Sequence, residues 1–242
     1  MTQVDAHNAI LADQRMRDWF VQEKILKEAH RRDAEAHQVP ERSVVTISRQ
    51  YGAGGHTFAG LLAGMLETPW QVWDREIVDA IAENANVRQE MVEALDERSH
   101  SLIEKISRTI SKIHPLTHEQ YRNHLIVVLT SISQQGKKII IGRGANFVLP
   151  QALNIRLIAS TPYRIRAVEV REGLSHMEAA AKVRKVDSER AAYIARLFDR
   201  DIDDPLEYDI VLRMDDISFE TAAAGIVGAI CRHQAETRGN LF

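Results

Sequence analysis

Apolar residues in the first part of the chain follow the spacing of a helix. Around Trp19 and Phe20 they recur every three or four positions, and only Glu23 interrupts the stripe. The opposite face carries charges of both signs, which is typical of a solvated surface. The pattern predicts one long helix over residues 1–37, ended by Pro40, because proline disfavours helical geometry in the residue before it. The stripe would pack either on the chain's own core or on a second subunit.

Further along, the pattern changes to short β-branched runs separated by helical segments. Strands are expected at residues 43–48, 71–73, 137–142, 154–159 and 208–212. Gly136 is expected to end the helix that precedes the third of them. Short buried strands that alternate with helices are typical of a parallel sheet covered on both faces. The predicted fold class is therefore a three-layer α/β/α arrangement with about five parallel strands.

Two stretches between the strands are predicted to be helical throughout. Residues 75–135 carry helical spacing with no strand pattern, so they form a helical insertion between two strands. Later, Ser175 and Glu178 form a capping box that starts a helix, and Asp187 is expected to cap the helix after it. These two helices would meet at Asp187 as a hinged hairpin over about residues 175–200.

Composition excludes several classes of protein. The 242 residues include 31 Lys and Arg against 34 Asp and Glu, which lacks the basic excess of a protein that binds nucleic acid polymers. No apolar run approaches the ~18 residues of a membrane span, and the N-terminus lacks the apolar core of a signal peptide. The single cysteine, Cys231, is typical of a reducing compartment, and the histidines show no metal-binding spacing. We therefore expect a soluble cytoplasmic protein without a membrane partner or a metal cluster.

The strongest local signal lies between the first strand and the helix that follows it. Residues 49–57 read Arg-Gln-Tyr-Gly-Ala-Gly-Gly-His-Thr. Main-chain N–H groups in such a turn, followed by a helix N-terminus, can hold a phosphate, and glycines let the main chain approach it. The sequence departs from the P-loop pattern G-x-x-x-x-G-K-[ST], because Arg49 stands at the first glycine, Gly55 at the lysine and His56 at the hydroxyl residue. The alternative is a tight strand-to-helix turn that needs small residues.

A second candidate is Arg143, which follows the third strand between two glycines. Ligands of open parallel sheets bind at the carboxyl ends of the strands, where a guanidinium can grip a phosphate with two hydrogen bonds. The alternative is an ion pair with a nearby carboxylate such as Asp74, which also ends a strand. The two interpretations are compatible, because a carboxylate can orient an arginine for a ligand.

A third candidate is the basic stretch at residues 182–200, which holds six cations against three anions. Arginines on a hinged hairpin would suit a lid that closes over phosphates, whereas a solvated helical face is the alternative. The next residues, 201–216, hold seven anions and one cation. We interpret this acidic run as the electrostatic counterpart of the hairpin in preference to a Mg²⁺ site.

Taken together, these segments resemble the cytidylate kinase-like family of P-loop nucleoside monophosphate kinases. The resemblance covers about residues 43–233 and rests on the order and spacing of residues 46–55, 73–77, 141–146, 187–193 and 204–212. It implies a P-loop kinase core at 41–74 and 136–236 with a lid at about 175–200, a helical insertion at 75–135 for acceptor binding or dimerisation, and an N-terminal helical extension at 1–40. It also implies ATP and Mg²⁺ as cofactors and nucleotides as substrates.

The resemblance assigns roles to single residues. The donor phosphates would be held by Gly52, Ala53, Gly54, Gly55, His56 and Thr57. Asp74 and Arg75 would face the acceptor nucleotide and Arg143 its phosphate, while Arg190, together with Arg184, would neutralise charge on the transferred group. Since the P-loop lysine is missing, Arg49 is expected to replace it as a catalytic residue beside Arg143 and Arg190. A further departure is Gly144, where cytidylate kinases tend to carry Asp.

The leading hypothesis is ATP-dependent phosphoryl transfer to a small acceptor, a nucleoside monophosphate such as CMP. One alternative is a nucleotide-binding regulatory protein on the same fold that is catalytically silent because Gly55 replaces the lysine. The other is a structural module that forms a homodimer through its helical segments. Fold alone does not separate these hypotheses.

Overall fold

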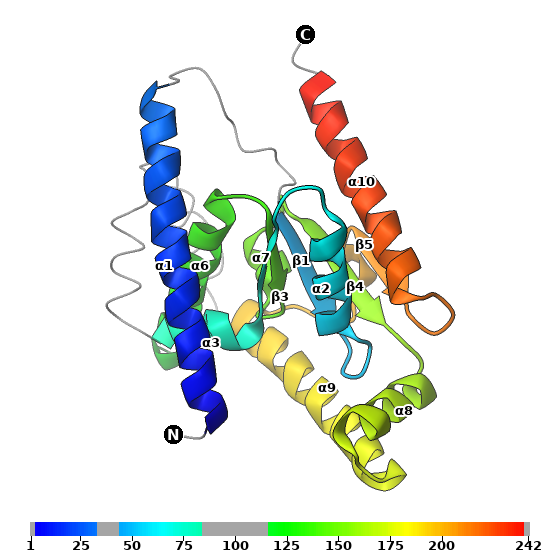
Figure 1. Cartoon of the computed structure of the whole chain (residues 1–242). Helices are drawn as coiled ribbons and strands as arrows, with labels where there is room; N and C mark the ends of the chain where they lie inside the picture. Colours follow the sequence, from blue (N-terminus) through cyan, green and yellow to red (C-terminus); the bar gives the residue numbers. More distant parts are fainter. Residues whose placement is uncertain (1–2, 33–43, 84–115, 240–242) are drawn as a thin grey trace.

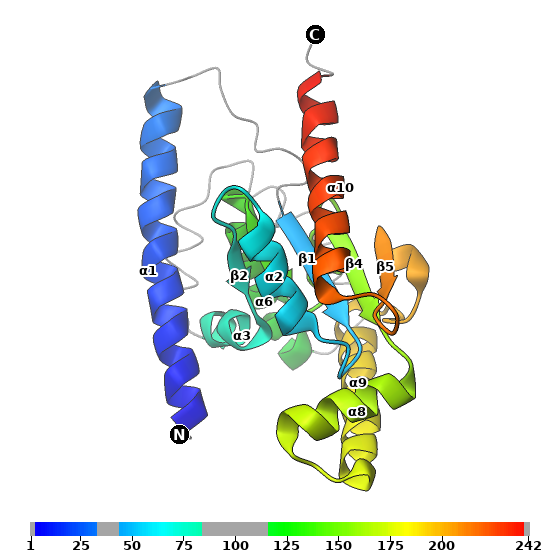
Figure 2. The same ribbon diagram turned by 45° about the vertical axis from the view of Figure 1, so that its right-hand side comes forward.

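Five strands form a single sheet at the centre of the molecule: β1 Val44–Arg49, β2 Gln71–Trp73, β3 Lys138–Ile141, β4 Leu153–Ile158 and β5 Ile210–Arg213. The computed structural model describes residues 3–32, 44–83 and 116–239. Within these ranges the strands lie in the order β2-β3-β1-β4-β5 and every neighbouring pair is parallel (Figures 1 and 2). All five predicted strands are confirmed, and β1 lies in the middle of the sheet.

Helices cover both faces of this sheet, as predicted. They are α1 Gln3–Arg32, α2 Gly55–Met65, α3 Arg75–Glu83, α6 Leu116–Gln134, α7 Ala145–Val148, α8 Thr161–Glu172, α9 His176–Phe198 and α10 Phe219–Gly239. α2 and α10 lie together on one face, whereas α3, α6, α7 and α1 lie on the other (Figures 1 and 2). The predicted insertion thus begins and ends with helices, and residues 84–115 lie outside the described residues.

Side chains of β1 alternate between the two faces with the period of two that a strand imposes. Val45 and Ile47 are fully buried against Phe58 of α2 and the apolar side of α10. The intervening Thr46 and Ser48 therefore point to the other face. Polar side chains of β4 meet them there: the Thr46 hydroxyl donates to Asn154 at 2.6 Å, and the Arg156 guanidinium donates to the Ser48 hydroxyl at 2.8 Å. The sheet thus has one apolar face and one face that turns polar toward its carboxyl end.

The apolar stripe of α1 packs on the chain's own core, which decides the alternative left open by the sequence. Met16 and Trp19 are buried in the cluster that includes Val78 of α3 and Leu125 of α6. The indole N–H of Trp19 donates to the main-chain oxygen of Ser131 at 3.2 Å. A buried indole needs such a partner, because its unpaired N–H would carry a desolvation cost. The helix is therefore an integral layer of the fold.

α8 and α9 form a helical hairpin at the carboxyl edge of the sheet, with Gly173 ending the first helix in a left-handed conformation. The predicted capping box is confirmed, since Ser175 and Glu178 each bond the other's main chain. The predicted break at Asp187 is wrong, because α9 runs from residue 176 to 198 without interruption. The side chain of Asp187 does not cap a helix but bonds to residues outside α9. The hairpin bends between α8 and α9.

Candidate functional site

The glycine loop connects β1 to α2 at the carboxyl end of the sheet. Gly52 and Gly54 have φ values of 85° and 81°, which glycine adopts without strain. Gly54 is the N-cap of α2 and makes no side-chain cap, so the first N–H groups of the helix are left for another acceptor. A Cβ at Gly54 would collide with the ring of Phe219 at the start of α10. The start of α2 therefore has main-chain N–H groups to which an anion could bind.

The side chain of Arg49 occupies the space beside Gly55. A Cβ built on Gly55 would lie 2.9 Å from Cγ and 3.3 Å from Cδ of Arg49. The guanidinium then reaches Gly142, where an added Cβ would collide with Nη1. A lysine side chain leaving the main chain at residue 55, as in the usual P-loop, and the stem of Arg49 would thus exclude one another. The stem of Arg49 thus occupies the space that the first carbon of such a lysine side chain would need.

Arg49 is buried and lies among other cations. Its exposed fraction is 8%, and burial together with the charges of Arg190 and Arg75 lowers its pKa to about 9. Burial also lowers the pKa of Arg190 to about 10, although Asp187 partly offsets this effect. The Nη1 of Arg190 donates to the main-chain oxygen of Arg49 at 3.0 Å. Glu76 and Asp187 offset these positive charges only in part, so cations held this close favour a negatively charged ligand between them.

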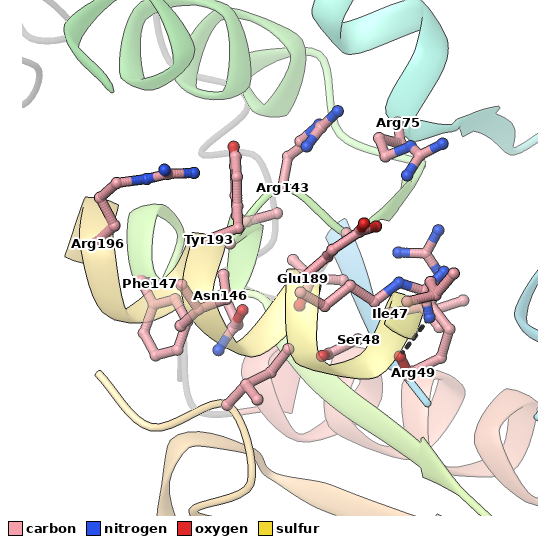
Figure 3. Close-up of a pocket in the computed structure, with 18 residues that line it drawn as sticks. Ile47, Ser48, Arg49, Arg75, Arg143, Asn146, Phe147, Glu189, Tyr193 and Arg196 are labelled. Carbon is pink, nitrogen blue, oxygen red and sulfur yellow. Dashed lines mark hydrogen bonds between the residues drawn. The ribbon is translucent and has the colours of Figure 1, made fainter. Parts of the chain in front are cut away.

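A pocket of about 230 Å³ opens between β1, the turn after β3, and α9 (Figure 3). Its lining includes five arginines: Arg49, Arg75, Arg143, Arg190 and Arg196. Glu189 is the one carboxylate among the lining residues, and it points toward Arg75 and Arg143 (Figure 3). Apolar side chains, among them Ile47 and Phe147, complete the wall. A small anionic molecule with an apolar part matches this lining.

Arg143 is held by a network at the edge of the pocket. Its Nη2 pairs with Asp79 of α3, whose other oxygen accepts a hydrogen bond from the Tyr121 hydroxyl at 2.9 Å. The guanidinium lies 4.9 Å from the ring centre of Tyr193. Burial opposes its charge, but Asp79 and Tyr193 outweigh burial and raise the pKa of Arg143. The predicted ion pair of Arg143 with a nearby carboxylate is therefore present, but its partner is Asp79 and not Asp74. Asp79 lies one turn into α3.

Tyr51 joins the glycine loop to the α8–α9 hairpin. Its N–H donates to Oδ1 of Asp187 at 2.8 Å, and its hydroxyl donates to Glu172. Its ring centre lies 5.2 Å from the guanidinium carbon of Arg171 and 5.4 Å from that of Arg190. Since Tyr51 is bonded through both its main chain and its side chain, the hairpin is attached to the loop at more than one point.

The structure brings most of the predicted residues to this edge of the sheet. Arg75 lines the pocket and is bonded to Glu76, and Asp74 acts electrostatically on His56. Burial, followed by the charge of Arg49, lowers the pKa of His56. Arg184 is different, because it is exposed on α9 and does not line the pocket. The glycines of residues 52–55 and the Gly-Arg-Gly sequence at residues 142–144 were thus the patterns that predicted the location of the site.

Several residues of the site were not singled out by sequence reasoning. They are Asp79, Tyr121, Glu189 and Tyr193 around the pocket, and Tyr51, Arg164 and Glu172 around the hairpin. Tyr193 lies three residues after Arg190 and four after Glu189 on the same helix, so the i+3 and i+4 spacings could have indicated these neighbours. Asp79 and Arg164 gave no such signal, because only the packing of α3 and α8 brings them to the loop.

Comparisons with known proteins give one family match and several similar folds. Residues 44–216 match the cytidylate kinase-like family. Among solved structures, an uncharacterized protein from Eubacterium ventriosum is 20% identical with a TM-score of 0.61, and the match covers 78% of this chain and 98% of that one. A shikimate kinase from Bacteroides thetaiotaomicron is 14% identical with a TM-score of 0.43, covering 78% and 98% of the two chains. At 20% identity the likeness to the Eubacterium ventriosum protein concerns the fold alone. A search of curated proteins gives no match, and no described helix is long and apolar enough to cross a membrane.

Proposed function

This chain belongs to the cytidylate kinase-like family, and from that premise we propose that it transfers a phosphoryl group from ATP to a small anionic acceptor. Family membership supports kinase-type chemistry. The acceptor that we propose is a nucleoside monophosphate such as CMP, held in the arginine-lined pocket. The observation that carries the proposal is the placement of Arg49, whose stem fills the space beside Gly55 and whose guanidinium lies at Gly142.

The donor phosphates would lie on the glycine loop. The main-chain N–H groups of residues 52 and 54–57 would offer donors to phosphate oxygens, whereas the N–H of Ala53 donates to the main-chain oxygen of Gln50 at 3.2 Å. The N-terminus of α2 adds its positive end. Arg49 supplies the cation that a P-loop lysine would supply. The absence of a hydroxyl residue at position 56 leaves Thr57 as the neighbouring hydroxyl. These features support a donor with two or more phosphates.

The acceptor would lie in the pocket, between the loop and α9. Arg143 is fixed by Asp79 and has its charge stabilised, so it can bind an acceptor phosphate without first being ordered. Arg75 approaches from the start of α3, and Asp74 precedes it at the end of β2. Arg49 lines the pocket and also borders the loop, so it would contact both substrates.

Phosphoryl transfer needs its reactants in line and the charge on the transferred group neutralised. Arg49 and Arg190 lie where the loop and the pocket meet, so they would stabilise charge between donor and acceptor. Burial and the neighbouring positive charges lower the pKa of both arginines, so their charged forms are electrostatically unfavourable without a bound anion. A negatively charged transition state would repay that electrostatic cost.

The family implies Mg²⁺, and the side chains around the loop are consistent with an ion that arrives with the donor. Among the described residues, no group of three or more His, Cys, Asp and Glu side chains could hold a metal ion. Mg²⁺ in nucleotide enzymes keeps several waters and is bound largely by substrate phosphates, with few protein ligands. Thr57 is the residue of the loop that could contact it. When bound, the ion would neutralise phosphate charge.

A coupled assay of ADP release tests the proposal. Wild-type protein with Mg²⁺-ATP is expected to turn over with at least one of CMP, dCMP, UMP and AMP. Arg49→Ala should lower kcat/KM about 100-fold, since a cation on the transferred group contributes on the order of 3 kcal/mol, and Arg49→Lys should recover part of it. Arg166→Ala, an exposed arginine of α8, serves as the matched control. Nucleotide binding without turnover on any acceptor would instead identify a silent regulator.

A further inference from the structure

Asp187 lies in the middle of α9, but its carboxylate is bound from outside that helix. Oδ1 accepts the hydrogen bond from the N–H of Tyr51 in the glycine loop, at 2.8 Å. Oδ2 pairs with Nη1 of Arg164 on α8. The guanidinium of Arg164 is buried and is oriented by the main-chain oxygens of Ala159 and Tyr51. A loop amide and a fixed guanidinium thus converge on one oxyanion.

These two donors are of the kind that binds phosphate. Main-chain N–H groups of glycine-rich loops and guanidinium groups are the common partners of phosphate oxygens in proteins. Asp187 therefore marks a position where an oxyanion is bound, directly beside the residues proposed to hold the donor. Arg190 lies one turn further along α9, with its guanidinium carbon 5.4 Å from the Tyr51 ring centre. A second anion could not take the same N–H and the same Nη1 while Asp187 holds them.

We propose that the carboxylate of Asp187 and the terminal phosphate of a nucleoside triphosphate compete for the N–H of Tyr51 and the guanidinium of Arg164. The inference rests on the proposed function, because it assigns one subsite to the donor. A triphosphate takes over both donors and releases Asp187. A diphosphate lacks the terminal group, so it leaves the carboxylate in place. The loop thereby distinguishes the substrate ATP from the product ADP.

Other contacts keep the hairpin on the loop when Asp187 is released. The Tyr51 hydroxyl is bonded to Glu172, which Lys182 also contacts. A Cβ on Gly52 would lie 2.6 Å from the main-chain oxygen of Arg164, so α8 packs directly on the loop. The bond to Asp187 is therefore not needed to attach the hairpin. Its loss changes what the loop can bind without detaching α8.

Binding of AMP-PNP and ADP to full-length Asp187→Asn, measured by calorimetry, tests the inference. AMP-PNP is expected to bind about tenfold more tightly than to the wild type, which corresponds to losing one charge-assisted competitor. ADP should change by less than about twofold. Asp199→Asn, at the C-cap of the same helix, is the matched control and should alter neither affinity, since asparagine also accepts its left-handed conformation.

Equal affinities of Asp187→Asn and wild type for AMP-PNP, or weaker binding of both nucleotides, would overturn the inference and assign Asp187 a purely structural role. Wild type that binds neither nucleotide nor inorganic tripolyphosphate would overturn the proposed function as well. If Asp187→Asn does not fold, hydrogen exchange of the wild type decides. AMP-PNP, but not ADP, should change the exchange of the Tyr51 amide, and identical exchange with both nucleotides would refute the competition.

Discussion

Two glycines of α2 allow the position of Arg49 to be tested without any ligand. Gly55 would place a Cβ 2.9 Å from Cγ of Arg49, whereas nothing lies within 4 Å of a Cβ on Gly60. Neither residue has a positive φ, so alanine suits both backbones. The two substitutions are therefore chemically identical and differ in what the new methyl group meets.

The structure predicts opposite signs for them. Gly60→Ala should stabilise the protein by about 0.5–1 kcal/mol, because alanine loses less conformational entropy in a helix. Gly55→Ala should destabilise it by about 1–2 kcal/mol, since the contact involves the inner part of the arginine stem, which cannot move without moving the guanidinium. At roughly 2–4 °C per kcal/mol for a chain of this size, the two midpoints should differ by about 5 °C.

Thermal and urea unfolding of the two variants, each also made in an Arg49→Ala background, measures these effects. Removing the stem should abolish the penalty at residue 55 and leave the gain at residue 60 unchanged, giving a coupling of about 1 kcal/mol or more between Arg49 and Gly55 only. If Gly55→Ala stabilised the protein as much as Gly60→Ala, the stem of Arg49 would not lie there. Arg49 could then not stand in for the absent lysine.

Three further outcomes are expected. Burial lowers the pKa of Arg49 to about 9, and phosphate binds the charged form of this side chain. AMP-PNP affinity should therefore be full well below pH 9, about half at pH 9, and fall toward tenfold per pH unit above it, with a flatter calorimetric profile for Arg49→Met; parallel profiles would contradict this. Trp19→Ala should cost about 3–5 kcal/mol in urea unfolding, and a loss under 1 kcal/mol would place the ring outside the core. Ser175→Ala should lower the free energy of unfolding by about 1 kcal/mol because Ser175 caps α9, whereas Ser188→Ala, in the interior of the same helix, should leave it unchanged. Equal losses in urea unfolding would indicate that a second helix begins at residue 188.

Local chemistry predicted the elements whose stability is local. The strands stand out because β-branched residues recur in short runs, and the capping box at Ser175 and Glu178 is a pattern of four adjacent residues. Asp187 was misinterpreted for the same reason. Asp next to Ser resembles a helix start in the sequence, but its carboxylate is satisfied by Tyr51 and Arg164, which are distant in the chain.

The site was predictable only as far as it depends on short motifs. Gly54 and Arg143 lie in short motifs, which predicted the glycine loop and the turn after β3. The partner of Arg143 depends instead on how α3 packs. Residue 79, one turn into that helix, reaches it. The space shared by Arg49 and Gly55 is likewise a tertiary fact: the sequence shows a missing lysine and a nearby arginine, and the folded chain shows that they exclude each other.

The burial of Trp19 shows that the hydrophobic core extends beyond the residues that match the family. The family match begins at residue 44, whereas Trp19, which precedes it in the sequence, is fully buried in a hydrophobic cluster. A protein truncated to the matched residues would expose apolar side chains of α3 and α6 to water, which favours aggregation. A change in oligomeric state after such a truncation would then reflect the newly exposed apolar surface and not a natural interface.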